Sequence, residues 1–301
     1  MDDVLVELLE PPGPVDVVAT ARGVAGVRRA ADGLWWATRT ASGPATVRIA
    51  PGATPGGAVE VVGWGPGAAD AVAAVPDLIG FTDLGTYHPT DPRLAEWQRR
   101  RPGLRLGHSA SVLEALLPTI VAQKVPSIDA ARAWRRLRRA FAEPAPGPAN
   151  LGLPPDPRRL ARLAYHDLHR FGIERKRAAP LLAACRAAPR LERLRRAGPE
   201  PLMAGLRQLR GVGAWTATSV AHAVTPHADI VVVGDYSLPS MVAWNLAGER
   251  RADDARMLEL LAAEAPHRAR AVQLVLRCGE VPPRHGPRLR AAAVVDLAFS
   301  P

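Results

Sequence analysis

The chain has 301 residues and a mass of 32.0 kDa, which exceeds the usual single-domain length of about 100–200 residues. Its hydrophobic content of 48% and charged content of 23% are ordinary for a globular protein, so wholesale disorder is excluded. No apolar run reaches the length of about 18 residues that a membrane span needs, and the N-terminus is acidic where a secretory signal is basic. We expect a cytoplasmic protein of two domains.

Cysteine content limits the cofactors that the chain can hold. Cys185 and Cys278 are the only thiols, and two thiols build neither a disulfide framework nor a four-cysteine iron–sulfur site. His166 and His169 lie three residues apart, but this pair is too small a ligand set to predict a metal site, so we expect none there. We predict no redox cofactor and no iron–sulfur cluster.

Charge is distributed unevenly along the chain. The net charge is +10 and the sequence pI is near 10.9. Residues 1–88 contain 5 basic and 10 acidic side chains, whereas residues 89–301 contain 34 basic and 19 acidic ones. This excess favours a polyanionic partner such as nucleic acid. Nearly all the basic residues are arginines, so codon bias acting on an ordinary surface stays open as an alternative.

The predicted elements begin with a small sheet. β-Forming residues at 34–40 and 45–49 flank a turn at 41–44, which indicates a hairpin. A strand is expected at 58–62, and Pro66 or Gly67 opens a helix through 68–75. We therefore predict an N-terminal antiparallel β/α structural domain over residues 1–88.

From about residue 91 the apolar spacing becomes helical. Six prolines between 143 and 157 exclude regular structure, so this stretch is predicted to be an exposed connection. The remaining pattern predicts a larger all-α domain over residues 89–301, and hence an α+β protein. Helices are expected near 113–121, 134–141, 158–170, 175–188, 190–197 and 254–278, and the segments at 199–224 and 235–247 are the most informative.

One segment carries most of the chemical information. Residues 201–217 predict a helix, a tight turn at Arg210–Gly213 and a second helix from Ala214. Two glycines let the backbone turn sharply and let an anion come close to the amide groups that begin the second helix. Such a site holds phosphate without reading sequence. A helix hairpin with an ordinary glycine cap is the alternative.

Asp235 follows 22 residues beyond Gly213, at the end of an apolar run. Taken alone, it is as well explained as the N-cap of the next helix. The two features together are more specific. Leu209-x-Gly211-Val212-Gly213-x-Trp215-Thr216-Ala217, followed by Gly234-Asp235-Tyr236, resembles the helix-hairpin-helix superfamily of DNA glycosylases. The alkylpurine branch, of the 3-methyladenine DNA glycosylase II type, is the most similar, and the resemblance covers about residues 60–280.

The resemblance implies a function. It makes Asp235 the catalytic carboxylate of a monofunctional enzyme that hydrolyses the N-glycosidic bond of alkylated purines, such as 3-methyladenine, in duplex DNA. The damaged base is flipped out of the helix before it is cut, as the first step of base excision repair. The implied partner is double-stranded DNA containing damaged bases, and we expect a monomer in the cytoplasm, associated with the nucleoid.

The resemblance also assigns the base pocket. Trp215 and Tyr236 match aromatic positions, where an electron-rich ring attracts a cationic base. Core packing remains the alternative for both. His267 stands where the family has tryptophan, and Ser219 and Ser237 are smaller than the usual occupants. Bifunctional relatives carry a nucleophilic lysine at the position of Trp215, so strand cleavage through a Schiff base is not expected.

The remaining implied contacts are with the DNA backbone. Lys124 stands where the family has an apolar wedge that fills the space left by the flipped base, so it is expected to contact phosphate or a base edge instead. A monovalent cation is implied at the main-chain carbonyls of Arg207, Leu209 and Val212. The residues expected at the DNA are Gln123, Lys124, Gly211, Val212, Gly213, Ala214 and Thr216.

Three alternatives stay open. A non-catalytic helix-hairpin-helix DNA-binding protein would have the hairpin and the charge without needing Asp235. A glycosylase specialised for bulky alkyl adducts would suit the smaller residues at Ser219, Ser237 and His267. A lyase-type enzyme would form a covalent DNA adduct that borohydride traps.

Overall fold

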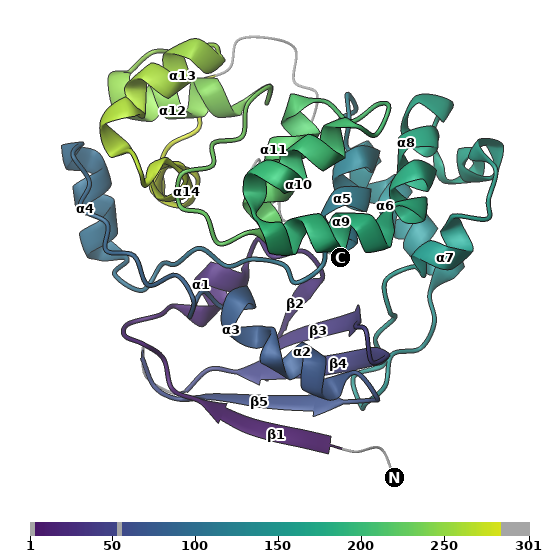
Figure 1. Cartoon of the computed structure of the whole chain (residues 1–301). Coiled ribbons are helices and arrows are strands. Elements are labelled where there is room, and N and C mark those ends of the chain that lie inside the picture. Colours follow the sequence, from purple (N-terminus) through teal and green to yellow (C-terminus); the bar gives the residue numbers. More distant parts are fainter. Residues whose placement is uncertain (1–3, 53–55, 284–301) are drawn as a thin grey trace.

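The structure is a computed structural model that describes residues 4–52 and 56–283. A sheet with three short helices forms its lower part, and the remaining helices are stacked above it (Figure 1). This architecture confirms the predicted α+β class. The predicted limits of the two domains, 1–88 and 89–301, stay a prediction.

The sheet is antiparallel throughout, with the strand order β1-β5-β4-β3-β2. The predicted hairpin is β3–β4, and the predicted strand at 58–62 is β5. The two edge strands, β1 and β2, were not predicted from the sequence. The strands are β1 (Val4–Leu9), β2 (Val27–Ala30), β3 (Gly33–Arg39), β4 (Pro44–Ala50) and β5 (Val59–Trp64).

One face of the sheet packs on short helices. α1 spans Val17–Ala21, and the helix expected at 68–75 is divided into α2 (Ala68–Ala73) and α3 (Val75–Leu78). Proline in the first turn of α3 explains the division, since proline is favoured there and cannot continue a preceding helix. The buried cluster between the two layers includes Trp36, Ile49, Val61, Val72 and Leu78.

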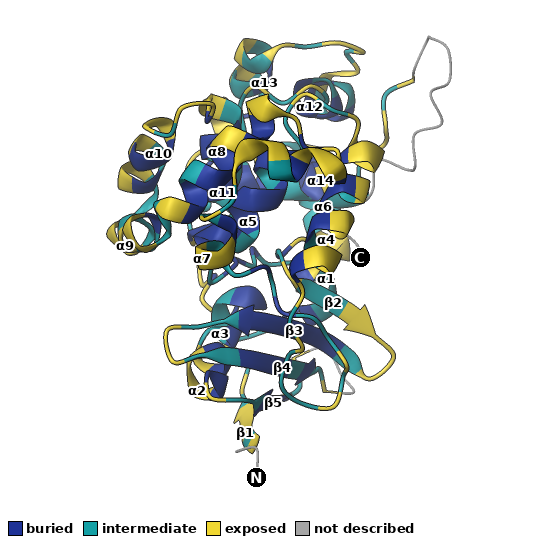
Figure 2. Cartoon of the chain, turned by 90° about the vertical axis from the view of Figure 1, so that its right-hand side faces the viewer, coloured by how far each residue is buried: buried dark blue, intermediate teal, exposed yellow. Residues whose placement is uncertain are grey.

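The helical part has two hydrophobic clusters, one around α5, α6, α8 and α11 and the other around α4, α12 and α14. Figure 2 shows dark buried faces turned inward on these helices. The helices are α4 (Pro92–Arg100), α5 (Val112–Val121), α6 (Ser127–Phe141), α7 (Pro157–Leu160), η1 (Tyr165–Phe171), α8 (Arg175–Arg186), α9 (Ala188–Ala197), α10 (Pro199–Arg207), α11 (Ala214–Val224), α12 (Leu238–Ala247), α13 (Asp254–Leu260), η2 (Ala262–Glu264) and α14 (Arg268–Cys278).

Two predicted helices are wrong in their continuity. The helix expected at 254–278 is broken into α13, η2 and α14, because Pro266 has no amide hydrogen to continue the helical ladder. The helix expected at 158–170 is divided into α7 and η1. Ala164 is extended there, and its amide donates 2.8 Å to the Asp167 carboxylate, which starts a new helical turn.

Glu114 joins the helical part to the sheet. This α5 side chain accepts hydrogen bonds from the Trp36 indole, at 3.0 Å, and from the Thr38 hydroxyl, both on β3. Burial raises its pKa to about 7, although both hydrogen bonds act in the opposite direction. Within the described ranges, the helices are all too short or too polar to cross a bilayer.

Candidate functional site: a helix hairpin and an aspartate

The hairpin of α10 and α11 has two glycines with different tasks. Gly211 has φ +91°, and a Cβ there would lie 3.1 Å from the Pro180 side chain of α8. Gly213 has φ −96°, and a Cβ there would meet nothing within 4 Å. The fold therefore requires glycine at 211. At position 213, by contrast, the space that a Cβ would occupy is open to solvent.

The first turn of α11 presents unused donors. Val212 is buried and donates its amide 2.9 Å to the Leu209 carbonyl, which closes the turn. The next three amides, of Gly213, Ala214 and Trp215, have no hydrogen-bond partner in the described parts of the chain. Exposed amides at a helix N-terminus attract anions.

A glutamine attaches the loop after α5 to this hairpin. The Gln123 amide nitrogen donates 3.0 Å to the Gly211 carbonyl and 2.8 Å to the Thr216 hydroxyl. Thr216 is only 2% exposed, so its side chain serves the interior rather than a partner. Lys124 follows at φ +55° with an exposed side chain. The hydrogen bonds of Gln123 therefore hold Lys124 next to the hairpin.

A buried arginine extends this arrangement to the next helix. Arg177, in the first turn of α8, donates from its two terminal nitrogens to the carbonyls of Val121 and Gly172, each at 2.9 Å. These carbonyls end α5 and η1, respectively. The hairpin, the loop after α5 and the start of α8 therefore lie side by side.

Asp235 lies between two helices, and each carboxylate oxygen has its own partners. Oδ1 accepts the amides of Ser237 and Leu238, at 2.8 and 2.9 Å, and the Ser237 hydroxyl at 3.1 Å. Oδ2 accepts the Trp215 indole N–H at 3.1 Å. Asp235 therefore accepts the amide that begins α12, whose N-cap residue is Ser237, while its second oxygen is directed to the start of α11. The sequence interpretation of Asp235 as the N-cap is two residues off, and its catalytic role stays a prediction.

A second carboxylate supports the backbone before Asp235. The Gly234 amide donates 2.7 Å to Oδ2 of Asp254, the first residue of α13. Gly234 has φ +76°, and a Cβ there would lie 3.3 Å from Cβ of Trp215. Sequence reasoning missed Asp254. Its one local signal was the pair Asp253-Asp254, of which only Asp253 caps α13.

The five predicted pocket residues differ in their contacts and in their exposure. Trp215 and Ser237 contact it directly, whereas Tyr236 is 100% exposed. Ser219 is half-buried on α11. His267 begins α14 and packs on Tyr87 with ring centroids 5.3 Å apart, while its buried Nδ1 has no partner in the described chain.

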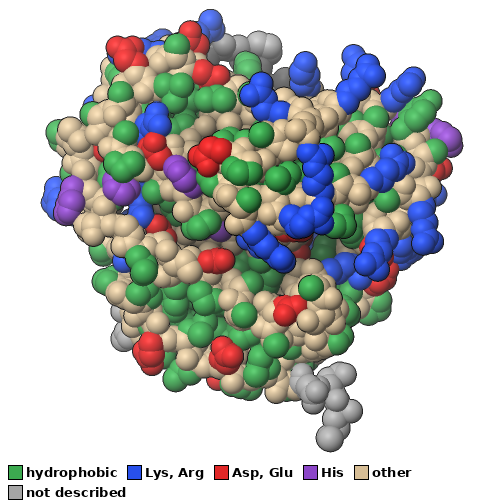
Figure 3. Space-filling view, in the orientation of Figure 1, with side chains coloured by type: hydrophobic (Ala, Val, Ile, Leu, Met, Phe, Trp, Pro, Cys, Tyr) green, Lys and Arg blue, Asp and Glu red, His purple; other side chains and the backbone are tan. Residues whose placement is uncertain are grey.

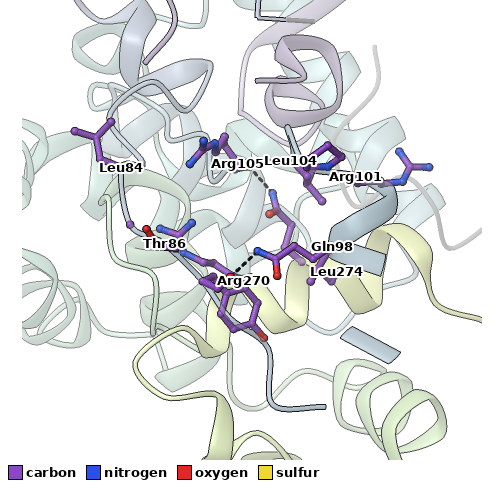
Figure 4. A pocket seen from close by; sticks show the side chains of 12 residues that line it. Leu84, Thr86, Gln98, Arg101, Leu104, Arg105, Arg270 and Leu274 are labelled. Atoms are coloured by element: carbon purple, nitrogen blue, oxygen red, sulfur yellow. Dashed lines mark hydrogen bonds between the residues drawn. The ribbon is translucent and has the colours of Figure 1, made fainter. Parts of the chain in front are cut away.

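A cavity of about 250 Å³ lies elsewhere, between α4 and α14 (Figure 4). The side chains of its two glutamines are hydrogen-bonded to backbone carbonyls. Gln98 donates to the Tyr87 carbonyl and Gln273 to the Arg105 carbonyl, at 2.8 and 2.7 Å. Arg270 pairs with Asp83 below it. Asp235 and the five predicted pocket residues do not line this cavity.

Cationic side chains surround the hairpin. Figure 3 shows Lys and Arg gathered over the helical half of this face, most densely toward its upper right. Four exposed cations near the hairpin have no hydrogen bond or ion pair within the described ranges: Lys124, Lys176, Arg207 and Arg210. The surface can therefore attract a polyanion without first breaking ion pairs.

Comparison with solved structures identifies the fold. No protein-family model matches the sequence, and no curated protein matches it. The 3-methyladenine DNA glycosylase from Archaeoglobus fulgidus is 18% identical, with a TM-score of 0.74 over 90% of this chain and 97% of that one. MBOgg1, solved with a low-affinity DNA ligand, is 14% identical, with a TM-score of 0.67 over 91% and 96%.

A third similar structure is the Clostridium acetobutylicum 8-oxoguanine glycosylase/lyase in complex with duplex DNA. It is 11% identical, with a TM-score of 0.56 over 85% of this chain and 98% of that one. The chain therefore has the fold of the helix-hairpin-helix DNA glycosylases. These identities do not distinguish the alkylpurine branch from the 8-oxoguanine branch.

Proposed function

We propose that the protein is a monofunctional DNA glycosylase that removes alkylated purines, such as 3-methyladenine, from duplex DNA. One observation carries the proposal: four donors hold the Asp235 carboxylate directly beside the first turn of α11, whose amides have no hydrogen-bond partner in the described parts of the chain. DNA glycosylase structures share the surrounding fold. The hairpin seats the DNA backbone, and the aspartate faces the nucleoside.

The reaction follows from charge. As the bond between C1′ and the base nitrogen breaks, its electron pair leaves with the base and positive charge develops on the deoxyribose. An ionised Asp235 stabilises that charge. Water then bonds to C1′, and its proton passes to the carboxylate or to solvent. An alkylated purine is a cationic leaving group, so the step needs little help from an acid.

Trp215 has two roles in this proposal. Its N–H orients Asp235, and its ring offers a face to a cationic base. Trp215 also lacks the amine needed for a Schiff base, which supports hydrolysis over lyase chemistry. Lysines are restricted to Lys124 and Lys176 in the whole sequence. Borohydride trapping of a DNA adduct would contradict this part.

DNA is proposed to bind through the amides of Gly213 and Ala214, with Lys124 reaching the space beside the flipped base. A monovalent cation at the carbonyls of Arg207, Leu209 and Val212 would strengthen the hairpin. Exchange of potassium for a bulky organic cation should then weaken DNA binding at constant ionic strength. We further propose that the enzyme is a monomer and acts on chromosomal DNA in the cytoplasm without a redox cofactor.

The test is release of free base from methylated duplex DNA by the purified wild type and by Asp235→Asn. The variant keeps the size of the side chain and an oxygen for the cap. We expect release by the wild type, a loss of at least a hundredfold in the variant, on the order of 3 kcal/mol, and strand breaks only after alkali. Equal release by both proteins would refute the role of Asp235.

One observation favours a second candidate, a glycosylase for bulky alkyl adducts. Tyr236 points fully into solvent, and Ser237, which contacts Asp235, is small, so neither residue closes an aromatic wall over the carboxylate. A panel of duplexes with methyl, ethyl and larger adducts on the same purine distinguishes the two. Faster release of the larger adducts would favour this candidate.

A further inference from the structure

A cationic and aromatic surface lies on η1 and the adjoining ends of α6 and α8. Tyr165 is 39% exposed, and the Arg175 guanidinium stacks over its ring at 4.9 Å. His169 packs on the same ring with centroids 5.7 Å apart. The Arg170 guanidinium stacks on Phe171 at 4.8 Å. We call this the η1 patch, and it consists of Tyr165, His169, Arg170, Arg175 and, from α6, Arg136 and Arg139.

The α6 side of the patch is hollowed. A shallow, open depression of about 520 Å³ is lined by Ala140 and Phe171 together with three arginines, namely Arg136, Arg139 and Arg170. No carboxylate lines it. A shallow depression lined by apolar and cationic side chains fits a sugar-phosphate segment, whose phosphates are charged and whose sugars are not.

The stacking prepares the guanidinium groups for phosphate. A guanidinium that lies on an aromatic ring keeps its N–H edge available while losing little freedom on binding. Two carboxylates occur in this segment. Asp167 accepts the Ala164 amide at 2.8 Å and Glu174 precedes α8. They are outnumbered by the cations of the patch, so its field is positive.

The position of the patch indicates which phosphates it meets. Arg177 connects the end of η1 with the end of α5, and Gln123 connects the loop after α5 with the hairpin. The order across the surface is therefore hairpin, loop, start of α8, patch. Figure 3 shows Lys and Arg side chains along the upper right margin and a histidine at its end. A duplex seated on the hairpin that continues over the loop reaches the patch.

We propose that the η1 patch is a second DNA-backbone site, which binds phosphates of the duplex on one side of the lesion, beyond the loop after α5. It takes a phosphodiester chain without regard to sequence. The proposal rests on the proposed function for the placement of the DNA. The patch supplies affinity and extends the footprint, and it leaves the chemical step at Asp235 unchanged.

The test compares the double variant Arg170→Gln/Arg175→Gln with the control Arg28→Gln/Arg29→Gln, which removes the same charge from β2 in the sheet. Binding to a duplex with a central abasic-site analogue is measured by fluorescence anisotropy between 50 and 200 mM salt, about the range in which phosphate contacts are lost. The slope of log K against log salt should be about 2 less negative for the patch variant than for the wild type, since each phosphate contact contributes about 0.9. The control slope should not change, and an unchanged patch-variant slope overturns the proposal.

A second arm locates the contact. Duplexes are extended by about 10 base pairs, one helical turn, on one side of the analogue or the other. One extension should strengthen wild-type binding, and that gain should disappear in the patch variant. A gain that persists in the variant overturns the proposal, as does stronger patch-dependent binding of single-stranded RNA than of duplex DNA.

Measuring base release distinguishes failure of the patch proposal from failure of the proposed function. The patch variant should release base at the wild-type rate when short duplex is saturating, which also shows that it is folded. If the wild type releases no base, the proposed function fails, yet salt slopes on undamaged duplex still test the patch.

Discussion

Glu114 should make the stability of the protein depend on pH in a direction opposite to that of most carboxylates. Its side chain is enclosed between α5 and β3, and burial raises its pKa to about 7 from the usual 4.5. The folded state therefore binds the proton more tightly than the unfolded state does. This contribution is complete below pH 4.5 and is lost as pH rises through 7.

The magnitude follows from the shift. A rise in the pKa from 4.5 to about 7 corresponds to about 3 kcal/mol in the free energy of unfolding. Glu114→Gln removes the titration but keeps both contacts, because its oxygen accepts from Trp36 and its amide donates to the Thr38 hydroxyl. The free energy of unfolding of the variant minus that of the wild type should therefore rise by about 3 kcal/mol between pH 4 and pH 8.

Urea denaturation at one-unit pH intervals, followed by tryptophan fluorescence, measures this difference. Glu143→Gln is the control, because hydrogen bonds from Arg39 and Arg159 hold the pKa of Glu143 below its usual value. That variant should lose stability relative to the wild type above about pH 4.5, with the opposite sign to Glu114→Gln. A pH-independent difference for Glu114→Gln, or one that falls with pH, would refute the reasoning.

Other substitutions test the hairpin, the support of Asp235 and the domain junction. Gly213→Ala should leave thermal stability within about 1 kcal/mol of the wild type, because its Cβ meets nothing, but should weaken duplex binding severalfold; Gly211→Ala should lower the melting temperature as well. Asp254→Ala should reduce kcat for base release about tenfold with KM unchanged, and Asp254→Asn, which keeps an oxygen for the Gly234 amide, should restore most of it; equal losses in both would assign the effect to charge. Burial lowers the pKa of His108 to about 3, so stability should fall by about 1.4 kcal/mol per pH unit below 6.5, and His108→Leu should flatten that slope in urea titrations.

Local signals predicted part of the sheet and the hairpin of the candidate site. The β3–β4 hairpin, α5 and the turn between α10 and α11 depend on short-range features: alternation, helical spacing and a glycine pair. Such features are complete within about a dozen residues, so the sequence alone suffices for them. The breaks before η1 and α14 were missed because apolar spacing continues across them. Pro266 was the sequence feature that indicated the break before α14.

The supporting contacts could not be predicted in the same way. Gln123 meets Thr216 across 93 residues, and Glu114 meets Trp36 across 78. Asp254 reaches Gly234 across 20. No periodicity relates such positions, since each depends on how separately folded elements pack. What the sequence shows is a polar residue within an apolar helix or beside a glycine turn, without its partner.

The direction of Tyr236 is a consequence of the cap that precedes it. Asp235 turns inward so that Oδ1 can accept the amides of Ser237 and Leu238. The residue between the carboxylate and those amides is then forced to the outside of the turn, and Tyr236 is accordingly 100% exposed. Adjacency to Asp235 in the sequence therefore does not place an aromatic ring beside its carboxylate. If the proposed reaction takes place here, Trp215 is the ring fixed at Asp235, and Tyr236 contacts a flipped base only from the solvent side.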